Sequence, residues 1–215
     1  MYTILKESGI NHLDLVVGTH PDADHIGGLP GALNFATADK VLSPVLDHDT
    51  EAFKDFLKYA QLNGGGMTVP KIGDTYSLGS AVVKILALNS GEESNDKSIV
   101  LKVSYGATSF LFTGDGELET EQRLINSGAD LSATLLKVGH HGSAESSTQA
   151  FLDKVQPEYA VISVGDDNNY GHPTKEVLDR LEIVGAKVYR TDFQGEITVI
   201  SDGTELTIAS EKNAS

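Results

Sequence analysis

Four side chains that can bind a metal ion fall within six residues near the start of the chain. The segment His20–His25 reads His-Pro-Asp-Ala-Asp-His, so its candidate ligands are His20, Asp22, Asp24 and His25. Imidazole nitrogen and carboxylate oxygen together suit zinc, manganese or iron. A helix would spread such neighbours around its circumference, whereas a loop can turn them toward one point. We therefore expect a metal-binding loop here.

Two further segments place polar side chains directly after an apolar run. Phe110–Thr113 leads into Asp115 within Gly-Asp-Gly, and Leu135–Val138 leads into His140 and His141 within His-His-Gly-Ser. A Gly-Asp-Gly by itself is typical of a turn. Active sites, however, gather at the carboxyl ends of strands in layered α/β folds, so three such segments in one chain support each other. We predict that Asp115 and the histidine pair complete the metal site.

The elements that must position these residues alternate between extended and helical patterns, which predicts an α/β fold. The predicted strands are Leu13–Val17, Val41–Ser43, Ala81–Leu88, Ser98–Ser104, Thr108–Phe112, Thr134–Val138, Tyr159–Val164, Lys187–Arg190, Glu196–Ile200 and Glu205–Ala209. The predicted helices are Gly27–Phe35, Thr50–Asn63, Glu117–Asn126, Ser147–Val155 and Thr174–Val184, with Thr50 and Ser147 as N-caps. Gly18–Asp24 and Asn89–Lys97 are expected to be polar loops, and Ser210–Ser215 a frayed tail.

The overall composition is that of one ordinary globular domain. Hydrophobic residues make up 40% of the 215 residues, and no apolar run approaches the roughly 20 residues that cross a bilayer. No cysteine is present, so any metal must be held by nitrogen and oxygen. The net charge of −15 argues against tight binding of duplex nucleic acid, although bound divalent ions can supply local positive charge.

The order of these motifs resembles the metallo-β-lactamase superfamily. The matching residues are H-x-D-x-D-H-x-G-G from His20, T-G-D ending at Asp115, and H-H-G-S from His140. The nearest branch is the one that contains the C-terminal domain of the ComEC DNA-uptake protein, and three further stretches support it: Asn95–Leu101, Val161–Pro173 and Arg190–Ile197. The resemblance covers nearly the whole chain. It implies one hydrolase domain over residues 1–215, built as a four-layer αββα sandwich.

The resemblance also implies a binuclear site with two divalent ions, zinc or manganese. His20 and Asp22 would hold the first ion, Asp24 and His25 the second, and Asp115 would bridge them. His140 or His141 would complete the second site, with His140 preferred. Asp24 counts as catalytic because it anchors that ion. Such a pair of ions generates hydroxide near neutral pH and stabilises charge on the attacked centre.

The chain departs from the superfamily pattern in three places. Asp22 stands where many members have histidine, which makes the site harder and favours manganese. A histidine that binds the first metal is expected in the middle of the chain, but Asn95–Ser98 takes its place and His48 precedes that region. The usual N-terminal strands with G-Q-G-D and I-D-T-G motifs do not occur. We therefore expect either a fold truncated at its N-terminus or a misassigned start of the chain.

Other polar residues are candidates for contacts with a substrate. His172, in Tyr-Gly-His-Pro, is expected to contact a scissile phosphate, to protonate a leaving oxygen, or to cap the helix that begins near Thr174. Ser143 and Asn168 are weaker candidates for binding a phosphate, as is Lys137.

The favoured function is a phosphodiesterase or nuclease that acts on single-stranded DNA. One alternative is hydrolysis of another ester, such as a phosphocholine diester of the cell wall or a lactone. A second alternative is a catalytically impaired metal-binding domain. The sequence predicts a chain that is soluble as given and extracytoplasmic if it belongs to a longer protein. It does not determine the natural substrate, the metal or the oligomeric state.

Overall fold

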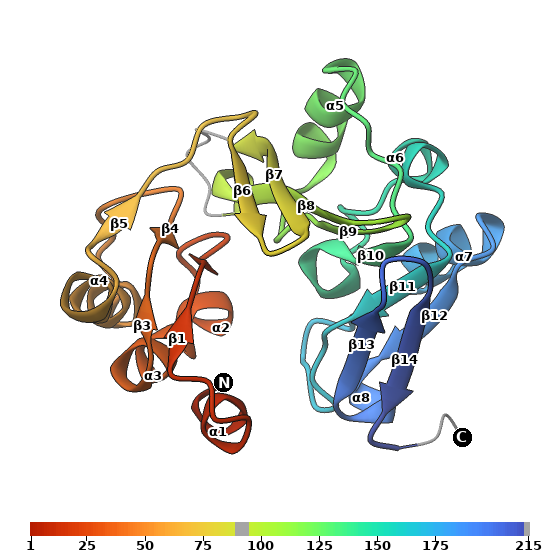
Figure 1. Cartoon of the computed structure of the whole chain (residues 1–215). Helices are drawn as coiled ribbons and strands as arrows, with labels where there is room; N and C mark the ends of the chain where they lie inside the picture. Colours follow the sequence, from red (N-terminus) through yellow and green to blue (C-terminus); the bar gives the residue numbers. More distant parts are fainter. Residues whose placement is uncertain (89–94, 213–215) are drawn as a thin grey trace. The chain divides into compact units, whose positions relative to one another are not determined.

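The protein, seen in a computed structural model that describes residues 1–88 and 95–212, consists of two compact units. The N-terminal unit comprises residues 1–74 and 88–99, and the C-terminal unit comprises residues 75–87 and 100–215. Figure 1 follows the chain through both units. The prediction of a single domain over residues 1–215 stays a prediction. Part of the expected loop Asn89–Lys97 and part of the expected tail Ser210–Ser215 lie outside the described residues.

The N-terminal unit is built from short strands and helices around an apolar core. Its strands form two small parallel sheets, of order β1-β3 and β2-β4-β5. The bounds are α1 Tyr2–Glu7, β1 His12–Leu13, β2 Val16–Val17, α2 Ala23–Ile26, α3 Leu29–Phe35, β3 Thr37–Ala38, β4 Val41–Leu42, α4 Glu51–Asn63, β5 Met67–Thr68 and the 3₁₀ turn η1 Asn95–Lys97. The core gathers buried side chains from β2, α2, α3, β4 and α4.

Helix α4 forms where the sequence predicts it. The Thr50 hydroxyl accepts a hydrogen bond from the amide of Phe53, which satisfies one of the free amides at the helix start. Phe53, Phe56 and Ala60 recur on one face and are buried in the core. Gly64 follows at the C-cap.

The expected strand Leu13–Val17 and the expected loop through Asp24 need correction. The chain bends after Leu13, so β1 and β2 are separate strands that pair with different partners. The metal-binding segment is also not all loop, because Ala23–Ile26 forms the short helix α2. Ile26 is buried on the core side of this helix, which leaves the preceding polar residues on its other faces.

The C-terminal unit is organised by a seven-stranded sheet of order β12-β11-β10-β9-β8-β7-β6. Strands β9 to β12 run parallel to one another, while β8 pairs antiparallel with β9 and β6 with β7. The strands are β6 Thr75–Leu78, β7 Ala81–Leu88, β8 Ile99–Tyr105, β9 Thr108–Phe112, β10 Leu135–Lys137, β11 Tyr159–Ile162 and β12 Lys187–Arg190. The carboxyl ends of β9 to β12 therefore meet at one edge of the sheet.

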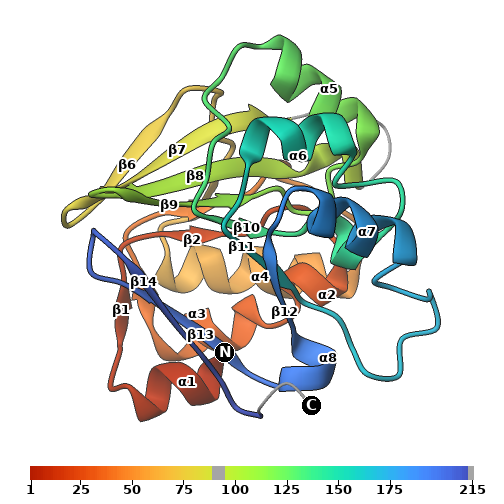
Figure 2. The ribbon, with the colours of Figure 1, turned by 90° about the vertical axis from the view of Figure 1, so that its right-hand side faces the viewer.

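Helices cover one face of this sheet, as Figure 2 shows for α5 and α6. Their apolar side chains and alternate residues of the strands form one buried cluster. Leu111, Leu136 and Ala160 contribute from β9, β10 and β11, because they are register partners on neighbouring strands and so lie on the same face of the sheet. The helices are α5 Leu118–Asn126, α6 Gln149–Val155, α7 Lys175–Ile183 and α8 Thr191–Gln194.

A C-terminal hairpin of β13 (Ile197–Ser201) and β14 (Leu206–Ser210) completes the unit. Its turn contacts the turn between β8 and β9, where the Ala107 amide donates to the Gly203 carbonyl at 2.7 Å. A Cβ atom on Gly106 would lie 2.1 Å from the same carbonyl oxygen. Glycine in the turn between β8 and β9 is thus required both by its φ of 58° and by the close backbone approach.

The structure also corrects the start of α6 and adds elements that the pattern missed. Thr148, and not Ser147, caps α6: its hydroxyl accepts from the Phe151 amide at 3.3 Å. Ser147 has a φ of 51°, outside the range of an N-cap. The short elements β5, β6 and α8 have too few residues to show a period. Among the described helices, none has the length and apolar character to cross a membrane.

Candidate metal centre

The first set of candidate ligands follows strand β2 in the N-terminal unit. Gly18 begins the turn, and a Cβ atom there would lie 2.8 Å from the Phe56 ring, so a larger residue would push the backbone away from α4. The Thr19 carbonyl accepts from the Ile99 amide at 2.8 Å, and the Thr19 hydroxyl lies 3.2 Å from Nδ1 of His20. These contacts hold His20, which is fully buried, at the end of the strand.

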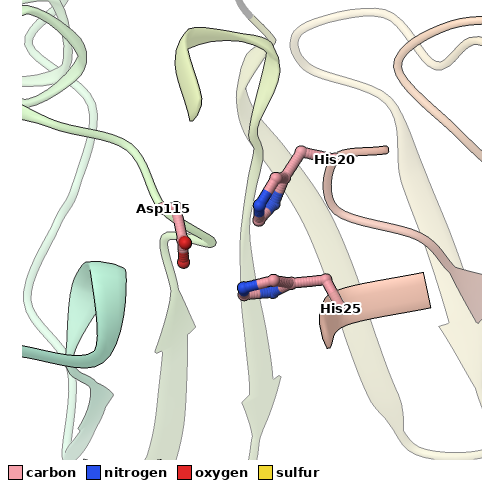
Figure 3. Close-up of side chains that lie close together, drawn as sticks. All are labelled: His20, His25 and Asp115. Carbon is pink, nitrogen blue, oxygen red and sulfur yellow. The ribbon is translucent and has the colours of Figure 1, made fainter. Parts of the chain in front are cut away.

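The remaining ligands of this set lie at the start of α2. Asp22 occupies the N-cap position, and its Oδ2 lies 3.7 Å from Nε2 of His20. On the helix, Oδ2 of Asp24 lies 3.5 Å from Nε2 of His25. The rings of His20 and His25 have their centroids 4.0 Å apart. Figure 3 shows both rings pointing in one direction, His20 from the loop and His25 from the helix, and it also draws Asp115 of the other unit.

The separations between these ligand atoms fit a shared metal ion better than a hydrogen bond. The nitrogen and oxygen of an N–H···O bond are about 2.7–3.2 Å apart, and the two pairs are 3.7 and 3.5 Å apart. Two ligand atoms at about 2.1 Å from a tetrahedral ion are roughly 3.4 Å apart. Imidazole with carboxylate is also a donor set that zinc and manganese accept. Each of these two pairs therefore has the donor types and the separation of two ligands of one divalent ion.

The second set lies at the carboxyl ends of the neighbouring strands β9 and β10 in the C-terminal unit. Asp115 follows β9 and is only 4% exposed. His140 and His141 follow β10 in the 3₁₀ turn η2 (Gly139–Gly142), with φ of 44° and 53°. Their Nε2 atoms lie 3.9 and 3.6 Å from Oδ2 of Asp115. Left-handed backbone costs free energy for residues with a Cβ, so surrounding contacts must hold this turn.

Each histidine of the pair has a polar neighbour at its other nitrogen, which for His141 is a hydrogen-bond acceptor. Nδ1 of His141 donates to the Ser163 carbonyl at 2.7 Å, because a carbonyl can only accept. Nε2 of a neutral His141 then presents its lone pair toward Asp115, and a cation between two such acceptors would be stabilised. Nδ1 of His140 lies 3.2 Å from a carboxylate oxygen of Glu117. Partners of this kind orient metal-binding imidazoles.

Hydrogen bonds from the protein interior hold the strained turn in place. The buried Ser146 hydroxyl donates to the Gly139 carbonyl at 2.8 Å, and the His140 amide donates to the Gly114 carbonyl at 3.2 Å. The second bond joins the loop after β10 to the loop that carries Asp115. The two candidate ligand loops of this unit are therefore fixed to each other through the backbone.

A buried carboxylate braces the far end of the same loop. Glu121 of α5, 2% exposed, accepts from the amides of Ser147 and Thr148, the latter at 2.9 Å. Burial raises the pKa of Glu121 to about 7, although these amides, Thr148 and Arg180 all act in the opposite direction. Arg180 also donates to the Ser146 carbonyl at 3.2 Å. Desolvation outweighs the hydrogen bonds here, so near neutral pH this brace is partly protonated.

The half-buried Lys137 at the end of β10 interacts electrostatically with Asp115. Burial lowers the pKa of Lys137 to about 8, while the charge of Asp115 acts in the opposite direction. Its Nζ donates to the Val138 carbonyl at 2.9 Å. The amine therefore offsets part of the negative charge at this end of β10.

The loop after β11 brings His172 to the histidine pair. The His172 ring lies 5.8 Å from the His140 ring, between centroids. Burial, followed by the charges of His140 and His141, lowers the pKa of His172, so the neutral imidazole predominates at pH 7. Asn168 accepts from the His172 amide at 3.0 Å and donates to the His172 carbonyl at 2.9 Å. Asn168 thus shapes the loop that carries His172.

Tight packing joins this loop to the histidine turn. Gly142 has a φ of 86°, and a Cβ atom there would lie 2.5 Å from Cβ of Pro173. Ser143 is buried, and its hydroxyl accepts from the Glu145 amide at 3.3 Å. Within the C-terminal unit, the candidate residues are therefore brought together around Asp115 and the histidine pair.

Sequence reasoning missed Glu117, Glu121 and the carbonyl of Ser163. Glu117 follows Asp115 by two residues, so the run Gly-Asp-Gly-Glu carried a usable signal. Glu121 looks like an exposed helix residue in the sequence, and a backbone carbonyl has no signature at all. His48, a histidine without assigned chemistry, lies 3.2 Å from the Thr50 hydroxyl at the start of α4.

Comparison with known proteins identifies the family that the motifs resemble. Residues 3–166 match the family model of the metallo-beta-lactamase superfamily. ComE operon protein 3 of Bacillus subtilis (strain 168) is 33% identical over 195 residues, which cover 90% of this chain and 25% of that protein. Competence protein ComA of Neisseria gonorrhoeae is 31% identical over 199 residues, which cover 90% of this chain and 26% of that protein. The chain spans about a quarter of these relatives.

A solved structure supports the fold. The putative metal-dependent hydrolase from Parabacteroides distasonis ATCC 8503 has a TM-score of 0.51 and 15% identity, over 84% of this chain and 77% of that one. This confirms the α/β metallo-β-lactamase fold predicted from the motifs. The chain therefore belongs to the metallo-beta-lactamase superfamily, with ComEC-like competence proteins among its relatives.

Proposed function

We propose that the two ligand sets act together as one binuclear metal centre that hydrolyses phosphodiester bonds, with single-stranded DNA as the favoured substrate. The observation that carries the metal centre is the pairing of His141 Nε2 with Asp115 Oδ2 at 3.6 Å, with Nδ1 of His141 already donating to Ser163. The His20–Asp22 and Asp24–His25 pairs of the N-terminal unit support the same chemistry. When bound, divalent ions supply a nucleophile from water near pH 7 and neutralise charge on phosphate oxygens.

We assign the candidate ligands to the following roles. His20, Asp22, Asp24 and His25 would hold metal from one side, and Asp115 would bridge two ions. We assign the remaining imidazole ligand to His141, because its Nδ1 bond leaves Nε2 toward Asp115. His140, whose Nδ1 lies beside the Glu117 carboxylate, would orient that charge next to His141.

His172 would contact a phosphate oxygen or the leaving oxygen of the substrate. Its neutral ring beside His140 can donate a hydrogen bond without adding charge. Asn168 would act through His172 by fixing its backbone, and Ser143 by shaping the turn after Gly142. Support for a DNA substrate comes from the relatives, one of which is named a competence protein.

The test is digestion of labelled single-stranded DNA with added manganese by the parent and by Asp115→Ala. A matched control is Asp179→Ala, which removes an exposed aspartate of α7 that pairs with Lys175. The proposal expects cleavage by the parent and the control but not by Asp115→Ala. It would be overturned if metal-loaded parent left single-stranded DNA, RNA and a generic phosphodiester all intact.

A further inference from the structure

The loop between β11 and α7 presents an exposed aromatic ring. Tyr170 is 83% exposed, the highest value among the large apolar side chains of the described residues. One face of its ring stacks on His172, with centroids 5.8 Å apart and ring planes inclined by 20°. The opposite face is left to solvent. Water contact with an aromatic face is costly, so a ligand that covers it would gain free energy.

The loop that carries this ring is braced by hydrogen bonds. The Asn168 side chain donates to the carbonyls of Gly165 and His172 at 3.0 and 2.9 Å, and accepts from the His172 amide at 3.0 Å. Pro173 then packs against Gly142 in the histidine turn. A braced loop loses little conformational entropy when a ligand stacks on it.

The ring also lies beside the residues that would hold metal. His172 separates Tyr170 from His140, and the rings of the two histidines have centroids 5.8 Å apart. The start of the same loop is bonded to His141 through the Ser163 carbonyl. A substrate whose phosphate reaches the histidine pair would therefore bring its adjacent group over Tyr170.

The chemistry of the loop indicates which group that is. Residues 163–173 contain no lysine or arginine but do contain Asp166 and Asp167, so the loop has no permanent positive charge with which to hold a phosphate at Tyr170. Recognition of a quaternary ammonium uses a cage of aromatic rings around the cation. Tyr170 and His172 are instead nearly parallel and offer one flat face, which matches a planar base.

We propose that Tyr170 is a stacking platform for the nucleobase next to the scissile phosphodiester of a single-stranded nucleic acid. This inference rests on the proposed function and names the group of the substrate that the site recognises. Stacking tolerates any base, because every base has an aromatic face. It also explains how a chain of net charge −15 can hold a polyanion that its surface repels.

The first experiment measures binding without catalysis. A trinucleotide that carries the fluorescent base 2-aminopurine is titrated with the full chain in EDTA at low salt, where stacking quenches its fluorescence. We expect Tyr170→Ala to weaken binding roughly 5- to 100-fold and Tyr170→Phe, which keeps the ring, to bind like the parent. Equal binding by the parent and Tyr170→Ala, or no quenching by the parent, would overturn the inference.

A control variant tests the location. Phe193 of α8 is also exposed, at 59%, but the Arg190 guanidinium lies 4.0 Å from its ring centroid and forms an ion pair with Asp192. Phe193→Ala should change the affinity less than about twofold. A loss equal to that of Tyr170→Ala would overturn the assignment of the base to Tyr170.

The second experiment separates this inference from the proposed function. The parent and Tyr170→Ala are compared, with manganese, on single-stranded DNA that has either a normal base or an abasic residue beside the cleaved bond. The inference expects a raised KM and unchanged kcat for Tyr170→Ala on the normal substrate only. Cleavage by the parent with no difference between substrates overturns the platform alone, whereas no cleavage of any phosphodiester overturns the proposed function. If choline phosphate displaced 2-aminopurine at Tyr170, the assignment of a nucleobase to this ring would be overturned in favour of a cationic ligand.

Discussion

The two sets of candidate ligands are built in different ways. In the N-terminal unit, four ligands come from one segment of six residues, and neighbours in the sequence are neighbours in space. In the C-terminal unit, the ligands come from loops after two strands, and buried side chains such as Ser146 and Glu121 hold them. The first set depends on local sequence, and the second depends on the folded sheet. Perturbing the fold should therefore affect the second set more.

The largest expected effect separates the two sets by their metal content. We expect Asp24→Ala to lose about one bound ion and Asp115→Ala to lose about two, because the proposal assigns Asp24 to one ion and Asp115 to both. Turnover should fall to the metal-free level in both. Elemental analysis of dialysed protein measures the ions. Equal loss in the two variants would show that the sets do not differ in this way.

The next effect concerns chemistry without loss of metal. His172→Ala should slow turnover by roughly 10²-fold if the ring donates a proton or hydrogen bond to the substrate. Its metal content should equal that of the parent, since His172 is not among the proposed ligands. If the variant loses metal, His172 belongs with the ligands of the C-terminal unit.

A smaller effect on stability tests the brace of the second set. The folded pKa of Glu121 is raised to about 7 from 4.5, so the folded state binds the extra proton between these values. The contribution of this bound proton to the free energy of unfolding is complete below about pH 4.5. It is lost as the pH rises through 7, and the total loss is about 3 kcal/mol. Glu121→Gln cannot ionise, so its stability relative to the parent should increase over this window.

Denaturant unfolding at pH 4 to 8 measures that difference. Glu119→Gln is the matched control, because Glu119 lies on the same helix but is exposed and paired with Arg123. Its difference from the parent should change little with pH. A difference for Glu121→Gln that stays flat with pH would contradict the buried brace.

The smallest effect compares equivalent helix caps in the two units. The Thr50 hydroxyl accepts from the Phe53 amide in one unit, and the Thr148 hydroxyl accepts from the Phe151 amide in the other, at 3.4 and 3.3 Å. Replacement by alanine should cost about 1 kcal/mol at Thr50. A larger loss at Thr148 is expected, because Thr148 also contacts Glu121. Equal losses would argue against coupling between this cap and the brace.

The sequence predicted those features that depend on local pattern. Helix α4 begins after Thr50 as expected, and strands β7, β9 and β12 have the predicted bounds. The fold could be predicted because three motifs in fixed order resemble one superfamily. The roles of the individual site residues stay predictions, and the structure adds a physical reason to weigh His141 above His140.

What the sequence could not predict depends on tertiary contacts. The division of Leu13–Val17 into two strands follows from pairing with different partners, which a run of apolar residues does not encode. Thr148 is the cap in place of Ser147, because Ser147 has a left-handed backbone and Thr148 has the extended backbone of an N-cap. Asn168 reads as a polar loop residue, and only the fold reveals that its amide closes the loop around His172.

The contact between Gly142 and Pro173 also constrains how this protein can change over generations. Any side chain at position 142 would meet Pro173 at 2.5 Å and would need a left-handed backbone as well. In a random library selected for function, substitutions at position 142 should therefore be rare. Lineages that do replace the glycine should carry a second change at position 173. Positions 142 and 173 are therefore expected either to be substituted together or to stay unchanged.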